Sequence, residues 1–521
     1  MSKLLTEYNN LLEQLITRSK NLDVYMVARI QQNKYFSVLY KNNQLDKVSL
    51  SSDKGIGIYA FTTSGHLAFA STNDLTDEES VIKVLENAAK IAHKNEEISF
   101  DKAPEIFKLS KQENLGEDHI HYLTNSVTNI NIDKLKSLFM QLEEYVKKCN
   151  SNIKVMLRVI VNDEQWRIVR SDTTDVDFSI PKVRLIINLA LKEGDKTSSI
   201  GFNYITTTLD KIFEVENVTT KLNETDAGET AEEFLNIKKI IKNKINHLEK
   251  QLDAESITPG HYPLLIDSDL CGMLTHEAFG HACESDAVAE DGSVLRAKDG
   301  TFKTGEQVAS VGVNIYDYEE GAAHGFHPYG AFGNLRQKVQ LVENGILKDS
   351  ISDVFTAEKI NVPQKNTERS ESYSSIAIPR MSNTYLEIDE SKYIKVQDIN
   401  KFDLSKIEDI QTVAIESGLL DKYPKLLVLM KMMGGQVETK QGDFMFGVGF
   451  VYEITKDKIT PYKPCSFSGK VLEALKSIQG AIGDVKKDVA GFCGKSGQTV
   501  CVNTGGNQLV LFKESNFVNI S

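Results

Sequence analysis

Strand-like and helical segments follow one another in this chain without the regular alternation that builds a parallel sheet. Strand-like runs occupy 23–72, 153–161, 165–171 and 183–192. Helical periodicity covers 3–20, 79–95 and 132–149. A doubly wound sheet needs a helix between successive strands, so this order predicts an α+β fold.

The chain changes character near residues 250–260. Residues 228–253 have the charged, periodic pattern of one long helix, which would bridge two halves of the molecule. After Pro259-Gly260, glycine becomes frequent and strand patterns dominate. We therefore expect two domains, an α+β domain at 1–255 that ends in the linking helix and a β-rich domain at 256–521.

The charge balance argues against a nucleic-acid binder. The 521 residues carry a net charge of −13 at pH 7. A protein that binds nucleic acid needs a basic surface to displace counterions from phosphates. We expect no nucleic-acid partner.

The chain also lacks the patterns of a membrane or secreted protein. Its most apolar run, 426–430, is interrupted by Lys431, far short of the ~20 residues that span a bilayer. The first eight residues meet acid too early for a signal peptide. The six cysteines form no C-x-x-C pair, which fits free thiols or metal ligands in a reducing cytoplasm. We expect a cytoplasmic protein without membrane contact.

The segment His276-Glu277-Ala278-Phe279-Gly280-His281 carries the chemistry of a metal site. Two histidines offer ligands for zinc, and a glutamate beside them can take a proton from water. The flanking residues are largely apolar, so the segment reads as a buried helix. Ionisable groups on a buried helix need partners, and this favours a metal over two unrelated structural histidines.

The spacing of the two histidines constrains the helix. They stand at i and i+5, roughly 140° apart around an ideal α-helix, whereas the common i and i+4 spacing gives roughly 40°. A π-type bulge with i→i+5 hydrogen bonds reduces the angle to about 50°. Gly280 would tolerate such a distortion. We therefore predict a helix over about 268–283 that is bulged between His276 and His281.

The third ligand must come from elsewhere, and the residues alone leave several candidates open. Glu284 follows three residues after His281, and His324 and His327 lie in a glycine-rich segment. Cys493 lies in a glycine-lined turn where another element can approach closely, although a lone cysteine can equally be an inert core residue.

Several ordered motifs resemble the TldD/PmbA family of metallopeptidases, in its metal-bearing TldD-like branch. They run from residue 55 to residue 498 and comprise Gly55-Ile56-Gly57-Ile58 through Gly65–Asn73, His276–Asp286, Pro379–Tyr385, Gly434-Gly435-Gln436 with Gly442-Asp443-Phe444, and Cys493-Gly494-Lys495 with Gly497-Gln498.

The resemblance implies a fold, a site and an activity. The fold is two α+β domains, the second built on a large twisted, mostly antiparallel β-sheet with the metal helix packed on it. One Zn²⁺ would be held by His276, His281 and Cys493, with Glu277 as the catalytic base. The substrate would be an unfolded or modified peptide, bound as an added strand with low sequence selectivity. The protein would form a homodimer, or a heterodimer with a metal-free paralogue.

Three hypotheses of function follow. In the first, Glu277 takes the proton of a zinc-activated water and passes it to the leaving amine, while Arg380 or backbone amides contact the peptide. In the second, the chain is a non-catalytic, metal-stabilised scaffold or partner subunit, for which a base beside the ligands would be superfluous. A third, regulation of nucleic-acid enzymes, is disfavoured by the acidic charge.

For the remaining singular residues a structural interpretation is preferred. We expect Trp166 to pack in the interior. We expect structural or solvated roles for His66, His93, His119, His121, His247 and His261.

Overall fold

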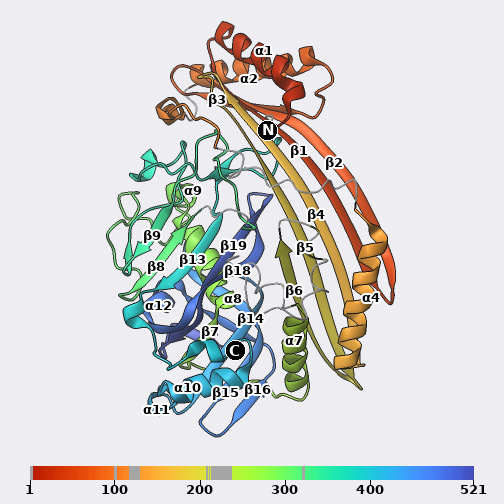
Figure 1. Ribbon diagram of the computed structural model, residues 1–521. Coiled ribbons are helices and arrows are strands. Elements are labelled where there is room, and N and C mark those ends of the chain that lie inside the picture. The colour runs from red at the N-terminus through yellow and green to blue at the C-terminus, as the bar shows by residue number, and fades with distance from the viewer. Residues whose placement is uncertain are drawn as a thin grey trace.

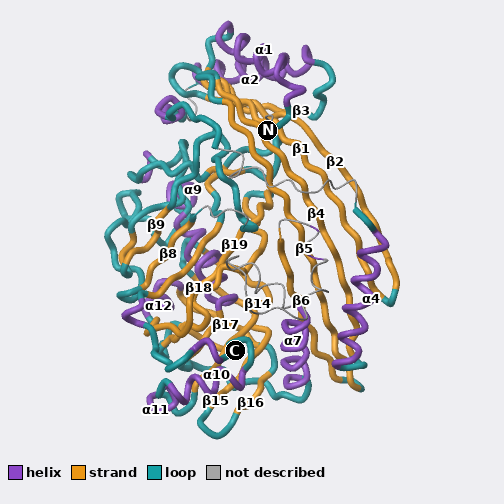
Figure 2. Tube along the Cα trace, viewed as in Figure 1, coloured by secondary structure: helices purple, strands orange, loops and turns teal. Residues whose placement is uncertain are grey.

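The computed structural model describes residues 4–98, 102–115, 130–206, 237–318 and 323–521, together with the single residues 209 and 212. Two β-sheets dominate it, one from each half of the chain, and helices lie at their ends and flanks (Figure 1). Strand and helix are both abundant and do not alternate (Figure 2), so the predicted α+β class is confirmed.

The first sheet has six antiparallel strands in the order β3-β2-β1-β4-β5-β6. These are β1 (Tyr25–Lys41), β2 (Gln44–Phe61), β3 (Leu67–Thr72), β4 (Ile153–Arg170), β5 (Asp175–Glu193) and β6 (Lys196–Thr206). The long strands form an arc along one side of the molecule, with the second sheet on its inner side (Figure 1).

One prediction for this sheet was wrong. The two strands expected at 153–161 and 165–171 are the single strand β4, and the strand expected at 183–192 begins earlier, as β5. Asp163 and Glu164 lie in the gap between the two expected strands, yet both pair with β1 and β5. In the sheet Asp163 is buried and Glu164 is half-buried. Glu164 accepts hydrogen bonds from Trp166 and Gln31, and burial raises the pKa of Asp163 to about 6.

Helices pack at both ends of this sheet. They are α1 (Asn9–Asn21), preceded by a 3-10 turn at Thr6–Tyr8, α2 (Glu78–Glu97), α4 (Ile132–Cys149) and α7 (Ile237–Gln251). The side chains of Asp77 and Asn131 accept hydrogen bonds from the first free backbone amides of α2 and α4 and so define where these helices begin. Of the long helix predicted at 228–253, α7 is the described part, and 228–236 lies outside the described residues.

The second sheet has 12 strands, ten of them in the order β10-β9-β8-β13-β19-β7-β14-β15-β17-β20, with β16 on β15 and β18 on β19. They are β7 (Leu264–Asp267), β8 (Val313–Asp317), β9 (Val339–Glu343), β10 (Ile346–Leu347), β13 (Asn383–Ile388), β14 (Leu426–Glu438), β15 (Asp443–Ile454), β16 (Ile459–Tyr462), β17 (Cys465–Lys470), β18 (Ile478–Lys495), β19 (Gln498–Phe512) and β20 (Val518–Ile520). The pairs β13/β19 and β14/β7 are parallel, and the other pairs are antiparallel. This is the large, mostly antiparallel sheet that the family resemblance implied.

Short elements complete this half. They are α8 (Ser268–Met273), α9 (Ser285–Ala289), α10 (Ile407–Glu416), α11 (Leu419–Lys422), α12 (Val471–Lys476) and a two-stranded ribbon of β11 (Glu368–Arg369) and β12 (Ile378–Pro379). Helix α8 packs against β19 and β14, which places the histidine segment on the second sheet.

The two sheets share hydrophobic cores. The largest core joins side chains of β1, β4, β5, α4 and α7 to side chains of β14, β15 and β19. A further core brings Trp166 and Phe178 together with Phe326 and Phe332.

The division into two domains between residues 255 and 256 stays a prediction. Among the described helices, none is long and apolar enough to cross a bilayer.

Candidate metal centre

The histidine segment is a helix with a π-helical turn. Strand β7 ends at Asp267, whose side chain accepts a hydrogen bond from the Leu270 amide and starts α8. The π turn then covers Leu274–Gly280. The backbone amide of His281 donates to the carbonyl of His276, five residues earlier. The predicted bulge is therefore confirmed, and it lies between the two histidines.

Gly280 is needed for a different reason from the one expected. Its backbone has φ −61° and ψ −46°, an ordinary helical conformation that any residue adopts. A Cβ atom there would lie 2.1 Å from Sδ of the buried Met381. The glycine allows the turn to pack closely against Met381, which precedes β13.

Strand β18 brings Cys493 to the two histidines. The β18–β19 hairpin turns at Ser496 and Gly497, both with positive φ, and aligns Cys493 with Val500. Sγ of Cys493 lies 3.2 Å from Nε2 of His281, and the rings of His276 and His281 are 5.3 Å apart. One ligand atom from each of the three residues lies within 4.8 Å of the others.

These three residues fit a zinc ion. Neither ring nitrogen of His276 has a hydrogen-bonding partner among the described residues, although the side chain is 1% exposed. A buried imidazole without partners is costly, and a metal would satisfy it. Tetrahedral zinc with nitrogen and sulfur ligands separates those atoms by about 3.3–3.6 Å. The distance of 3.2 Å between Cys493 Sγ and His281 Nε2 is close to that range. Two imidazoles and one thiolate leave a fourth position open, as catalytic zinc sites do.

Cys493 and each of the two histidines shift one another's pKa values toward the charged forms. Burial would raise the pKa of Cys493, but His281 and His276 lower it to about 5. Burial would lower the pKa of His281, but Glu284 and Cys493 raise it well above its usual value. The pKa of His276 is raised as well, by Cys493 and Glu277 against burial. Cys493 is thus a thiolate at neutral pH, the form that binds metal.

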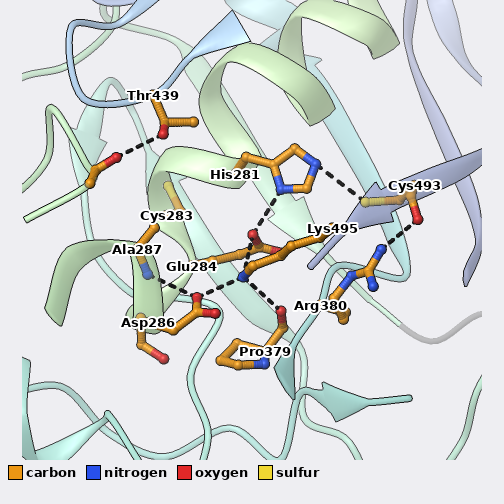
Figure 3. A network of polar contacts seen from close by, with 12 residues as sticks. His281, Cys283, Glu284, Asp286, Ala287, Pro379, Arg380, Thr439, Cys493 and Lys495 are labelled. Carbon is orange, nitrogen blue, oxygen red and sulfur yellow. Dashed lines mark hydrogen bonds and ion pairs between the residues drawn. The ribbon is translucent and has the colours of Figure 1, made fainter. Parts of the chain in front are cut away.

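A buried ionic network orients His281 (Figure 3). Nδ1 of His281 donates to Glu284 (2.8 Å), which leaves Nε2 directed at Cys493. Lys495 donates to Glu284 (2.9 Å) and Asp286 (2.7 Å). Burial would raise the pKa of Glu284, yet Lys495 and His281 lower it to about 2. Glu284 is therefore a carboxylate that fixes the ring orientation and tautomer of His281, as partners of metal-binding histidines do.

Glu277 lies at the open side of the group. Its Oε2 is 3.6 Å from Nε2 of His281, the nitrogen that faces Cys493. Its side chain is 28% exposed, whereas that of His281 is 11% exposed. A carboxylate in this place can reach a water molecule held at the open ligand position.

Arg380 contacts the thiolate residue through its backbone. Its Nη2 donates to the carbonyl oxygen of Cys493 (Figure 3), and the side chain is fully buried. Nε and Nη1 have no hydrogen-bonding partner within the described part of the chain. A contact of Arg380 with substrate stays a prediction.

The other candidate ligands lie elsewhere. Glu284 bonds the far nitrogen of His281. The His324 ring packs edge-on against Phe492 at 5.4 Å, and Nδ1 of His327 lies 2.6 Å from the carbonyl of Tyr329.

The residues given a structural interpretation have structural contacts where they are described. Trp166 is 2% exposed. His66, His93, His247 and His261 lie within hydrogen-bonding distance of Ser64, Leu22, Tyr452 and Val518, respectively. His119 and His121 lie outside the described residues.

The sequence reasoning missed the orienting role of Glu284 and the part played by Lys495. One signal was available for Glu284, because a carboxylate three residues after a helical histidine can reach its ring. For Lys495 the signal was only its place two residues after Cys493. Its contact with Glu284 joins positions 211 residues apart and follows from the tertiary fold.

Two family models match parts of the chain. Residues 259–504 match the family model for the PmbA/TldA metallopeptidase C-terminal domain, and residues 27–92 match that for PmbA/TldA metallopeptidase domain 1. The first match contains the histidine segment and Cys493.

Curated relatives are named as metalloproteases. A metalloprotease of Methanocaldococcus jannaschii is 24% identical over 92% of this chain and 94% of its own length. A metalloprotease of Methanothermobacter thermautotrophicus is 35% identical, but the match covers 49% of this chain and only 50% of that protein. A protein of Saccharolobus solfataricus named as a zinc metalloprotease TldD homolog is 24% identical over 63% of each chain.

The fold is similar to that of TldE from Thermococcus kodakarensis. The two structures superpose with a TM-score of 0.69, covering 98% of this chain and 100% of that one at 15% sequence identity. At this identity the likeness concerns the fold alone.

Proposed function

The chain belongs to the TldD/PmbA family of metallopeptidases, and we propose that it is a zinc-dependent hydrolase of unfolded or modified peptides with low sequence selectivity. In this proposal one zinc ion is held by His276, His281 and Cys493, and Glu277 is the general base. The zinc assignment is supported by the name of the Saccharolobus relative and by the donor set of two imidazoles and one thiolate.

One observation carries the proposal. Three ligand atoms from distant parts of the chain converge within 4.8 Å, and the carboxylate of Glu277 lies 3.6 Å from one of them. A purely structural site needs a fourth protein ligand and no base. A base beside three ligands is the arrangement of a hydrolytic site.

The residues act on water and on the departing amine. When bound, zinc would supply a Lewis acid that polarises the scissile carbonyl and makes water a better nucleophile at neutral pH. Glu277 takes the proton as the water oxygen attacks the carbonyl carbon, and then gives it to the amine nitrogen as the C–N bond breaks. Glu284 keeps Nε2 of His281 directed at the site throughout. Nη1 of Arg380 is a candidate donor to the peptide.

We also propose the setting in which the protein works. A cytoplasmic location is supported by Cys493, because this thiol must remain reduced to act as a ligand. Assembly as a homodimer, or as a heterodimer with a metal-free paralogue, is part of the proposal. Sedimentation of the purified chain, alone and with such a paralogue, would decide between them.

The test separates the base from the ligands. Glu277→Gln should keep one zinc per chain by elemental analysis but lose at least about a hundredfold in hydrolysis of an unfolded peptide. Glu290→Gln is the matched control, because Glu290 is exposed and close in sequence, and it should leave both properties unchanged.

Two results would contradict the mechanism. Full activity of Glu277→Gln would exclude its role as the base. A zinc-loaded wild-type protein without peptidase activity, alone and with a paralogue, would favour the alternative of a non-catalytic, metal-stabilised scaffold or partner subunit.

A further inference from the structure

Residues 368–381, here called the strap, run between the two sheets. They include the β11–β12 ribbon and end just before β13. One side of the strap holds the hairpin that carries Cys493. Arg380 donates to the carbonyl of Cys493, and Nη2 of Arg369 donates to the carbonyl of Cys501 on the facing strand (2.9 Å).

The tip of the hairpin is held by the same segment. Its contacts are Gln498 Nε2 to the Ile376 carbonyl (2.8 Å), the Glu371 amide to Gln498 Oε1 (3.0 Å) and the Thr499 amide to Glu371 Oε2 (3.1 Å). The strap therefore bonds the hairpin on both of its strands.

The other side of the strap is held by the first sheet. Arg29 on β1 donates from Nη1 to Ser370 Oγ (2.7 Å) and from Nη2 to the carbonyl of Ser375 (2.8 Å). Arg29 is fully buried, with its guanidinium 5.2 Å from the ring centroid of Tyr59. Two further bonds join Gln31 Oε1 to the Tyr373 amide (2.9 Å) and the Tyr59 hydroxyl to the Ala377 amide (2.7 Å).

Gly55 and Gly57 on β2 allow the strap to lie this close. A Cβ atom on Gly57 would lie 2.0 Å from the carbonyl oxygen of Tyr373, and one on Gly55 would lie 2.2 Å from the Tyr373 ring. Neither glycine is among the residues with positive φ. The Gly-Ile-Gly-Ile motif is therefore a docking surface for the strap, a part that the peptidase chemistry does not explain.

We propose that Arg29 is a positioning residue for the metal centre, acting through the strap on the backbone of Cys493. The inference rests on the metal site of the proposed function. Arg29 holds the strap at Ser370 and Ser375, and Arg369 and Arg380 at the ends of the strap hold the hairpin carbonyls. The first sheet thus sets where the Cys493 thiolate stands relative to His276 and His281.

The bond between the Cys493 sulfur and the metal is the quantity to measure, and cobalt reports it. In the full-length protein loaded with Co²⁺, the thiolate-to-cobalt absorption band reports the Cys493 bond. Arg29→Met should weaken this band and lower the affinity for Co²⁺ and Zn²⁺ about tenfold, the lower end of the range for partners that orient ligands. Turnover should fall with little change in KM.

Arg167→Met is the matched control. Arg167 is a buried arginine on β4 of the same sheet, bonded to Asp175, Asn9 and the Leu5 carbonyl, none of which belongs to the strap. It should lower the melting temperature while leaving the cobalt spectrum and affinity unchanged. Equal effects of the two substitutions on cobalt binding would overturn the inference.

A milder pair decides the matter if Arg29→Met does not fold. Tyr59→Phe removes only the hydroxyl that accepts from Ala377 in the strap, and Tyr35→Phe removes one that accepts from Arg158 on β4. Only Tyr59→Phe should weaken cobalt binding, and identical binding in both variants would refute the inference. A wild-type protein that binds no metal through a thiolate would instead refute the metal site itself.

Discussion

The histidine segment and the Cys493 hairpin serve the same centre but are built in different ways. His276 and His281 owe their relation to one hydrogen bond inside a π turn. Cys493 lies 212 residues after His281 and arrives through the pairing of β18 with β19 and the contacts of the strap. Half of the site is a local property of six residues, and the other half is a property of the folded sheets. Four predictions test this contrast.

Removing a proposed zinc ligand from either the histidine segment or the Cys493 hairpin should have the largest effect. Cys493→Ala and His276→Ala should each lower kcat/KM at least roughly a thousandfold, because the loss of the zinc removes several kcal/mol of transition-state stabilisation. Zinc at a hundred times its Kd should stabilise the wild type by about 2.7 kcal/mol, and neither variant should show this gain. Elemental analysis measures the bound zinc, and thermal unfolding with and without zinc measures the stabilisation. One tightly bound zinc in Cys493→Ala would show that the hairpin supplies no ligand.

Lys495→Met should weaken the link between the Cys493 hairpin and the histidine segment. Without its cation, Glu284 and Asp286 repel each other and His281 loses its orientation, so zinc affinity should fall 10- to 100-fold. The pKa of Glu284 is lowered to about 2 in the folded protein, mainly by Lys495 acting against burial. Its stabilisation, about 3 kcal/mol at most, is therefore present above pH ~4.5 and is lost as pH falls toward 2.

In Lys495→Met the pKa of Glu284 should be lowered less, so this loss on acidification should be smaller than in the wild type, which denaturant unfolding at several pH values would reveal. Lys440→Met is the control, because Lys440 forms an exposed ion pair with Asp291. The same acid profile in Lys495→Met and wild type would contradict the assigned network.

Gly280→Ala should disturb only the histidine segment and leave the Cys493 hairpin as it is. The added methyl group meets Met381 Sδ, which we expect to cost about 1–3 kcal/mol of stability and about tenfold in zinc affinity. Met381→Ala in the same chain should restore part of the affinity by making room. Gly491→Ala on β18 is the control, since nothing lies within 4 Å of its added Cβ. A Gly280→Ala protein with wild-type zinc affinity would show that the turn tolerates side-chain volume.

Cys501→Ala should have the smallest effect. Cys501 lies on β19 and bonds Arg369 through its carbonyl, which the substitution retains. Zinc content should be unchanged, and the loss of stability should stay below about 1 kcal/mol. A thiol titration together with zinc analysis checks that the ligand is Cys493. A loss of zinc in Cys501→Ala would show that the thiolate ligand had been assigned to the wrong cysteine.

The same contrast explains how much the sequence could reveal. The π turn could be predicted because the i, i+5 spacing and the apolar flanks are local. The break expected near Asp163 was wrong because Glu164 has partners inside the sheet, Trp166 on the same strand and Gln31 on the neighbouring strand β1, and the contact with Gln31 exists only in the folded sheet. From the residues alone Cys493 remained one of several candidates, and only the family resemblance singled it out. Lys495 and Arg29 act through contacts between distant parts of the sequence, which exist only in the folded chain.

The place of β19 has a consequence for the order of synthesis. This strand lies between β13 and β7, although it follows both in the chain, and its neighbour β18 carries Cys493. A ribosome therefore releases the histidine segment long before the centre of the sheet can close. A chain synthesised only as far as the histidine segment holds two of the proposed ligands and Glu277 but lacks Cys493, so the proposed site is incomplete at that stage. The three-residue site of the proposed function can therefore form only after β18 has been synthesised and has paired with β19.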